Sequence, residues 1–122
     1  LDPGIGTFLF RPLVTQANST NGFMLKVADN GTPSLSATQS FSVIVNPLSA
    51  PGLSSISAAG GQISFNVSGQ SGPDYAIETS TNLTQWSNVF ITNSPTLPFN
   101  WTDAATNSPQ RFYRIKLGPP LP

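Results

Sequence analysis

Hydrophobic and polar residues alternate along most of the chain, and this period of two places every second side chain on one face of a β-strand. The inward-facing members of these runs are Phe8 and Phe10; Phe23, Leu25 and Val27; Phe41, Val43 and Val45; Ile63, Phe65 and Val67; Tyr75, Ile77 and Thr79; Phe99 and Trp101; and Tyr113, Ile115 and Leu117. A further run covers residues 86–91. No run of ten residues follows a helical period, and residues 81–85 suffice for one helical turn at most. The pattern predicts an all-β chain built of antiparallel β-sandwich modules.

Turn-forming residues separate the alternating runs. They are Asn21-Gly22, Asn30-Gly31-Thr32-Pro33, Gly60-Gly61, Ser71-Gly72-Pro73, Asn93-Ser94-Pro95 and Asn107-Ser108-Pro109. After Val45 the alternation is interrupted over a longer stretch than at the turns. This interruption predicts a linker over residues 47–52, which separates a first module at 1–46 from a second module at 53–118. Residues 119–122 form a proline-rich tail that cannot pair as a strand interior, because proline lacks the backbone donor.

Charged residues make up only 8% of the chain, against about 25% in a typical soluble domain, and the net charge is zero. Nucleic acids and anionic membrane surfaces both attract clusters of Lys and Arg, so neither is an expected partner. Membrane insertion is not expected either, because no run of about 20 apolar residues occurs. Copies with so little charge repel one another weakly, which favours self-association.

The chain has no cysteine and no histidine. It therefore has no disulfide, and it lacks the thiolate and imidazole ligands that zinc, iron and copper prefer. Gly69-Gln70-Ser71-Gly72 does not have the spacing of a nucleophile elbow, and its serine would lack the usual histidine base. We therefore expect a protein without enzymatic activity and without a cofactor, calcium being the one exception to consider.

One segment is similar to a known motif. Ala28-Asp29-Asn30-Gly31-Thr32-Pro33-Ser34-Leu35-Ser36 resembles the cadherin pattern A-x-D-x-G-x-P, and residues 2–45 resemble the second half of a cadherin-like or immunoglobulin-like repeat. Such repeats occur in large secreted proteins of environmental bacteria and supply roughly seven strands over about 100 residues. Because only about three strands are expected here, the resemblance implies that the front half of this module is missing from the chain.

The second module has a resemblance of its own. Its segments Tyr75-Ala76-Ile77-Glu78-Thr79-Ser80-Thr81-Asn82-Leu83-Thr84-Gln85-Trp86 and Arg111-Phe112-Tyr113-Arg114-Ile115, with Asp103, are similar to the fibronectin-III-like C-terminal module of such bacterial proteins. The two resemblances together cover nearly the whole chain. They imply a secreted or cell-surface location and no enzymatic activity.

Asp29 is the candidate metal ligand, because the matching aspartate binds calcium in cadherins. Calcium takes about six to eight oxygen ligands, and only Asp2 and Asn30 are available nearby to help. The family's other acidic ligands would lie in the missing half or in a neighbouring repeat. The alternative interpretation is a simple turn in which Asn30 and Gly31 adopt positive φ.

Asp74 and Glu78 are the pair of carboxylates to consider as catalytic groups. Four residues along a strand span about 13 Å, which exceeds the roughly 5–9.5 Å between the carboxylates of glycosidases. We therefore expect both side chains on a solvated outer face. The same module has a small basic stripe, which Asp74, Glu78 and Asp103 are expected to offset; it consists of Arg111, Arg114 and Lys116.

Four aromatic side chains are candidates for stacking on sugar rings: Tyr75, Trp86, Trp101 and Phe112. Trp101 shares a strand face with Phe99, which is typical of a core, so we expect Trp86 and Trp101 to be core residues. Phe112 is expected on the outer face, covered by a loop or neighbouring module.

Tyr113 is the candidate for a tyrosine corner, in which the hydroxyl bonds to nearby backbone.

These observations predict a non-catalytic structural or adhesion module of a secreted or cell-surface bacterial protein. Its partners would be other modules of the parent protein or copies of itself, and strand addition to the incomplete first module would build a filament. The alternative is a carbohydrate-binding module of a polysaccharide-degrading enzyme, which requires at least two coplanar, exposed aromatic rings. A calcium-stabilised adhesin would instead melt at a higher temperature when calcium is added.

Overall fold

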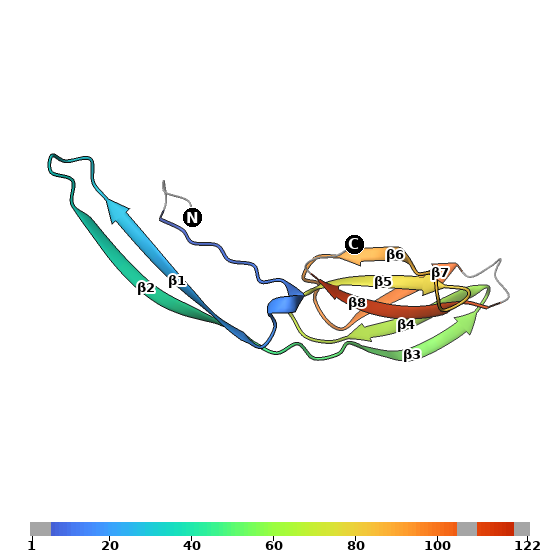
Figure 1. Cartoon of the computed structure of the whole chain (residues 1–122). Helices are drawn as coiled ribbons and strands as arrows, with labels where there is room; N and C mark the ends of the chain where they lie inside the picture. The colour runs from blue at the N-terminus through green and yellow to red at the C-terminus, as the bar shows by residue number, and fades with distance from the viewer. Residues whose placement is uncertain (1–5, 105–109, 119–122) are drawn as a thin grey trace.

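The computed structural model describes residues 6–104 and 110–118, in which eight strands pair into three antiparallel sheets (Figure 1). The strands are β1 (Ser19–Ala28), β2 (Ser36–Val45), β3 (Gly52–Ala59), β4 (Gln62–Ser68), β5 (Asp74–Ser80), β6 (Ser87–Thr92), β7 (Phe99–Ala104) and β8 (Phe112–Gly118). A 3-10 turn, η1 (Val14–Gln16), precedes β1. The predicted all-β, antiparallel class is confirmed.

The core lies between two three-stranded sheets, ordered β3-β4-β7 and β6-β5-β8. The alternating sets of β4 and β5 supply its fully buried side chains, Phe65, Val67, Tyr75 and Ile77. Burying each of these hydrophobic side chains stabilises the fold by about 1.5–3 kcal/mol. Side chains from the other strands and loops pack around them; they are Leu53, Ile63, Leu97, Phe99, Trp101, Tyr113, Ile115 and Leu117.

The predicted turn at Gly60-Gly61 is present in the structure, but the one at Asn21-Gly22 is not. Gly60 and Gly61 join β3 to β4 with φ of 59° and 73°, the pair of positive φ values that a tight two-residue hairpin requires. The predicted turn at Asn21-Gly22 is wrong, because both residues lie within β1 and pair with β2 in an uninterrupted register. The predicted turn at residues 107–109 lies outside the described residues.

β3 has no clear signal in the sequence. It is rich in serine and alanine, and a bulge interrupts its register with β4 between Ser54 and Ser57. Ser55 has a φ of 52° there, and Ile56 points into solvent. β3 begins at Gly52, the last residue of the predicted linker.

β1 and β2 form a separate hairpin in which Phe23 lies opposite Phe41. The strand predicted around Phe8 and Phe10 is wrong, since residues 8–13 belong to no strand. This stretch instead runs alongside the hairpin and ends at η1, next to the sandwich (Figure 1). Its alternation reflects side-chain packing on the hairpin and not membership of a ladder.

Candidate interaction surface

One face of the β1–β2 hairpin is apolar. It consists of Phe23 and Leu25 from β1 with Phe41 and Val43 from β2, and we call these four residues the hairpin face. The rings of Phe23 and Phe41 are stacked, with their centroids 5.6 Å apart. All four side chains are only half-buried, so the hairpin face keeps much of its apolar surface in contact with solvent.

The chain covers part of the hairpin face with residues 7–11, which we call the N-terminal segment. The Phe8 ring meets those of Phe23 and Phe41 edge-on at 4.8 and 5.4 Å. The Phe10 ring meets Phe23 at 5.0 Å. Leu9, between them, points away and is 85% exposed. Thr7 forms an isolated β-bridge, whereas residues 8–12 make no backbone hydrogen bond to the hairpin within the described ranges, so ring contacts hold Phe8 and Phe10 there.

The outer edges of the hairpin join no other strand of the part of the chain that the structure describes. Among the described strands, β1 and β2 pair only with each other, so the outward N–H and C=O groups of each strand face no neighbouring strand. Such an edge is a template on which another strand can pair. The hairpin therefore combines an incompletely covered apolar face with two edges to which no further described strand is paired.

The N-terminal segment is tied to the sandwich at its far end. Arg11 Nη2 lies 2.5 Å from Asp74 Oδ1, and the same oxygen accepts a hydrogen bond of 3.0 Å from the Ser94 backbone. A second contact across the junction joins the Ser49 N–H to Gln70 Oε1 at 3.2 Å. Arg11 also borders a mostly apolar cleft of about 230 Å³, smaller than the roughly 300–1,000 Å³ of typical small-molecule sites.

The expectation that Asp74 and Glu78 are solvated is wrong. Asp74 is 5% exposed and Glu78 is 4% exposed. The reason is that β5 is the central strand, with β6 and β8 on either side, and that Arg11 of the N-terminal segment and Arg114 of β8 lie against its outer face. Each carboxylate is satisfied by its own arginine, Asp74 by Arg11 and Glu78 by Arg114.

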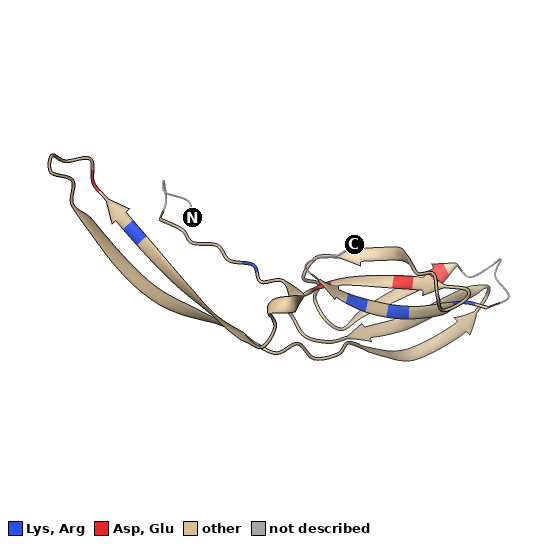
Figure 2. Ribbon diagram, in the orientation of Figure 1, with Lys and Arg blue, Asp and Glu red and all other residues tan. Residues whose placement is uncertain are grey.

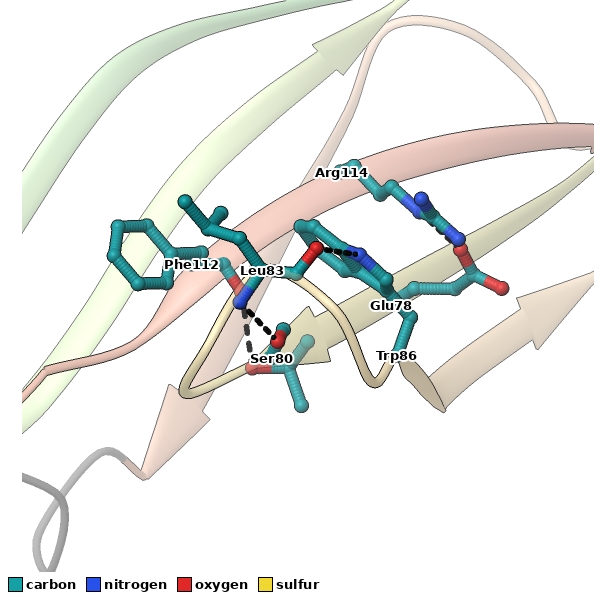
Figure 3. A network of polar contacts seen from close by, with 7 residues as sticks. Glu78, Ser80, Leu83, Trp86, Phe112 and Arg114 are labelled. Atoms are coloured by element: carbon teal, nitrogen blue, oxygen red, sulfur yellow. Dashed lines mark hydrogen bonds and ion pairs between the residues drawn. The ribbon is translucent and has the colours of Figure 1, made fainter.

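The outer face of the β6-β5-β8 sheet holds a stack that sequence reasoning missed (Figure 3). Arg114 Nε donates a hydrogen bond of 2.5 Å to Glu78 Oε2, while its guanidinium lies 4.1 Å from the centre of the Trp86 ring. That distance is typical of a cation–π contact. Trp86 thus lies on the outer face, and its predicted place in the core is wrong. Trp101, as predicted, packs against the core.

The loop that presents Trp86 is shaped by side-chain hydrogen bonds and not by a helical turn. Ser80 Oγ accepts hydrogen bonds from the backbone of Asn82 and Leu83. Asn82 Oδ1 accepts two more, from Thr84 and Gln85. The Leu83 carbonyl in turn accepts a hydrogen bond of 3.1 Å from Trp86 Nε1, which fixes the ring against the sheet. Such local bonds compete with the helix.

The tyrosine-corner prediction falls on the wrong residue. Tyr113 donates its hydroxyl to Asp103 at 2.8 Å, and Arg111 also binds that carboxylate. Tyr75 is the one that bonds to backbone, donating to the Gln70 carbonyl five residues upstream at 2.7 Å. Burial raises the pKa of both tyrosines, and for Tyr113 the neighbouring carboxylate raises it further.

Two residues of the predicted basic stripe form ion pairs, whereas Asp74, also expected to offset the stripe, pairs with Arg11 instead. The expected offset is confirmed for Arg111 with Asp103 and for Arg114 with Glu78. The hydrogen bond to Asp103 is the main cause that raises the pKa of Arg111.

Asp29 closes the loop between β1 and β2. Its Oδ1 accepts hydrogen bonds from the N–H groups of Leu35 at 2.8 Å and Gly31 at 3.0 Å, and these bonds lower its pKa. Ser34 Oγ donates to the Asp29 carbonyl. No group of three or more His, Cys, Asp or Glu that could hold a metal occurs within residues 6–104 and 110–118. Asp2 lies outside those ranges, and calcium binding at Asp29 stays a prediction.

Comparisons of the chain with protein-family models, with curated proteins and with solved structures found no match in any of the three. The described residues also contain no helix of the length and hydrophobicity that a membrane span needs.

Proposed function

We propose that the chain is a non-catalytic structural module of a secreted or cell-surface protein, and that it works by associating with copies of itself through the β1–β2 hairpin. The observation that carries this proposal is the hairpin face. It stays half exposed beneath the N-terminal segment, and among the described strands β1 and β2 pair only with each other.

Two physical arguments support association at the hairpin. Monomeric proteins rarely expose a contiguous apolar surface flanked by free strand edges, because both features invite pairing. Charge does not oppose it, since Lys26 is the only charged residue of β1 and β2 (Figure 2). The net charge of zero likewise leaves no long-range repulsion between copies.

The resemblance of residues 28–36 to the cadherin motif supports a place among the repeated modules of secreted bacterial proteins. In such proteins, rigid sandwiches in series space or display other domains. The sandwich at β3 to β8 suits that role, because three ion pairs join its strands to one another and to the N-terminal segment. Association at the hairpin would then extend the array.

The geometry favours this role over the polysaccharide-binding alternative. Tyr75 is 1% exposed, Trp101 packs in the core, and the Arg114 guanidinium occupies one face of Trp86. These three residues therefore do not supply the coplanar, exposed pair of rings that the alternative requires.

Sedimentation velocity over a wide concentration range, with negative-stain microscopy, tests the proposal. We expect the wild-type chain to form dimers or fibres as its concentration rises, and Phe23→Ser/Phe41→Ser to stay monomeric. The matched control is Met24→Ser/Ile44→Ser, which removes two apolar side chains from the opposite face of the same strands, where they are 71% and 72% exposed. A wild-type chain that remains monomeric at every concentration would overturn the proposal.

A further inference from the structure

The chain itself shows which strand fits the hairpin face. In the N-terminal segment, Phe8 and Phe10 point toward the hairpin face while Leu9 points to solvent. That alternation is the one a strand uses on a half-buried surface. The segment is thus a strand-like plug, seated by three ring contacts to Phe23 and Phe41.

We infer that this plug is exchangeable, so that residues 7–11 of one copy bind the hairpin face of a second copy. This inference rests on the proposed self-association and names the element that performs it. Each copy then gives its own segment and receives another. A reciprocal exchange closes a dimer, whereas exchange around a chain of copies builds a fibre.

Exchange costs little because the bonds that hold the plug can all be remade between copies. The ring contacts and the Arg11–Asp74 ion pair join residues far apart in the sequence, and the same contacts form when a second copy supplies the segment. Apart from an isolated bridge at Thr7, the plug has no backbone ladder that must first be broken, as far as the described residues extend.

A short hinge separates the plug from β1. It comprises Pro12, Leu13, the turn η1 and Asn18, which has a φ of 59°. While the hinge is folded back, it holds the plug across the hairpin face, where residues 8–12 make no backbone hydrogen bond to either described strand. A plug from another copy has no such tether, so it is free to pair with an open edge of β1 or β2 through backbone hydrogen bonds. Those additional bonds favour the exchanged form.

A donor–acceptor experiment with two full-length variants tests the inference. Phe8→Ser/Phe10→Ser has no working plug but keeps its hairpin face, and Phe23→Ser/Phe41→Ser has the reverse defect. We expect each alone to be monomeric, with self-association weakened at least about tenfold. An equimolar mixture, unfolded and refolded together, should yield a discrete heterodimer of about twice the 12.9 kDa chain mass.

The possible results separate the inference from the function on which it rests. If the wild-type chain does not associate, both the proposed self-association and the exchange of the plug are wrong. If Phe8→Ser/Phe10→Ser alone still assembles, bare hairpin faces pack directly on each other, which overturns exchange but leaves self-association standing. If the wild-type assembles but the mixed variants do not pair, exchange is again overturned.

Two further measurements guard against misfolding. Trp86 and Trp101 both lie in the sandwich, so tryptophan fluorescence reports whether it is intact in each variant. The milder pair Phe8→Leu/Phe10→Leu keeps apolar side chains in the plug, and we expect it to assemble at least threefold more weakly than wild type. If Phe8→Leu/Phe10→Leu assembles as strongly as wild type and Phe8→Ser/Phe10→Ser also assembles, the plug is not the element that mediates self-association.

Discussion

At the scale of single residues, the sandwich keeps its few charges by pairing them. Glu78 is nearly fully buried in the central strand, and burying an unpaired carboxylate is costly. Arg114, which lies on the neighbouring strand β8, offsets this cost by donating a hydrogen bond to the Glu78 carboxylate. Its guanidinium also covers one face of the Trp86 ring. The side chain of Arg114 is itself half exposed, so solvent screens the pair and limits what it contributes.

Replacing Arg114 should therefore destabilise the sandwich by more than removal of an ordinary surface charge. We expect Arg114→Ala to lower the free energy of unfolding by about 1–3 kcal/mol, because Glu78 loses its partner and Trp86 its cover. Arg114→Lys should fall between it and wild type, since an ammonium cannot both stack and donate in a fixed plane. Urea unfolding followed by tryptophan fluorescence measures all three.

Lys116 provides the control for this prediction. It is an exposed cation on the same face of β8, two residues beyond Arg114. Lys116→Ala should change stability by no more than about 0.5 kcal/mol. Equal effects at the two positions would show that the stack with Glu78 and Trp86 contributes nothing.

At the scale of elements, the sequence predicts strands well where alternation is strong and closed by a clear turn. β4 and β5 have such alternation, with Phe65 and Val67 in one strand and Tyr75 and Ile77 in the other. β3 does not, because its serine-rich exposed face and its bulge erase the period of two. The Phe8–Phe10 alternation shows the converse: a strand-like pattern marks packing on a sheet without joining it.

The candidate surface was predictable only in part. The alternation identifies Phe23 and Phe41 as inward-facing, but not that the N-terminal segment lies over them. Likewise, the spacing of Asp74 and Glu78 indicates an outer face, but burial depends on β5 being central, and strand order is set by long-range pairing. Arg11 gives no local sign that it pairs with a residue 63 positions away.

The loop between β1 and β2 is the element whose closure can be tested by pH. Two backbone N–H groups bond to the Asp29 carboxylate, and they lower its folded-state pKa below the ordinary value of 3.8. The stabilisation is therefore fully present above the unfolded pKa and is lost as pH falls through the folded one. We expect the NMR amide shifts of Gly31 and Leu35 to titrate together, with a midpoint below 3.8.

Substitutions of Asp29 distinguish its role in closing the loop through hydrogen bonds, which we call the loop cap, from a role as a metal ligand. Asp29→Ala should abolish both titrations and raise amide exchange at Leu35, whereas Asp29→Asn should keep an acceptor oxygen but lose the pH dependence. A midpoint at or above the ordinary aspartate value would contradict the cap. Shifts of these two amides on adding millimolar calcium, absent in Asp29→Ala, would instead establish the predicted calcium site.

At the scale of the whole molecule, the Arg11–Asp74 pair links the two halves. The N-terminal segment packs on the hairpin at one end and is bound to the sandwich at the other, so it braces the hairpin against the sandwich. The Ser49–Gln70 hydrogen bond provides a second tie across the same junction. In the proposed array of modules, these joints would limit the stiffness.

Loosening this brace should widen the range of orientations between hairpin and sandwich. The chain has no cysteine, so Ser36→Cys in β2 and Ser57→Cys in β3 give two exposed spin-label sites, one in each half. Labelled chain diluted into unlabelled chain reports distances within one copy by double electron–electron resonance. We expect Arg11→Gln to broaden the distance distribution, and Lys26→Gln, which removes a cation remote from the junction, to leave it unchanged.

Because Arg11 is half exposed, about 1 M salt should broaden the wild-type distribution toward that of Arg11→Gln. Identical distributions for wild type and Arg11→Gln at low salt would mean that the linker alone sets the angle.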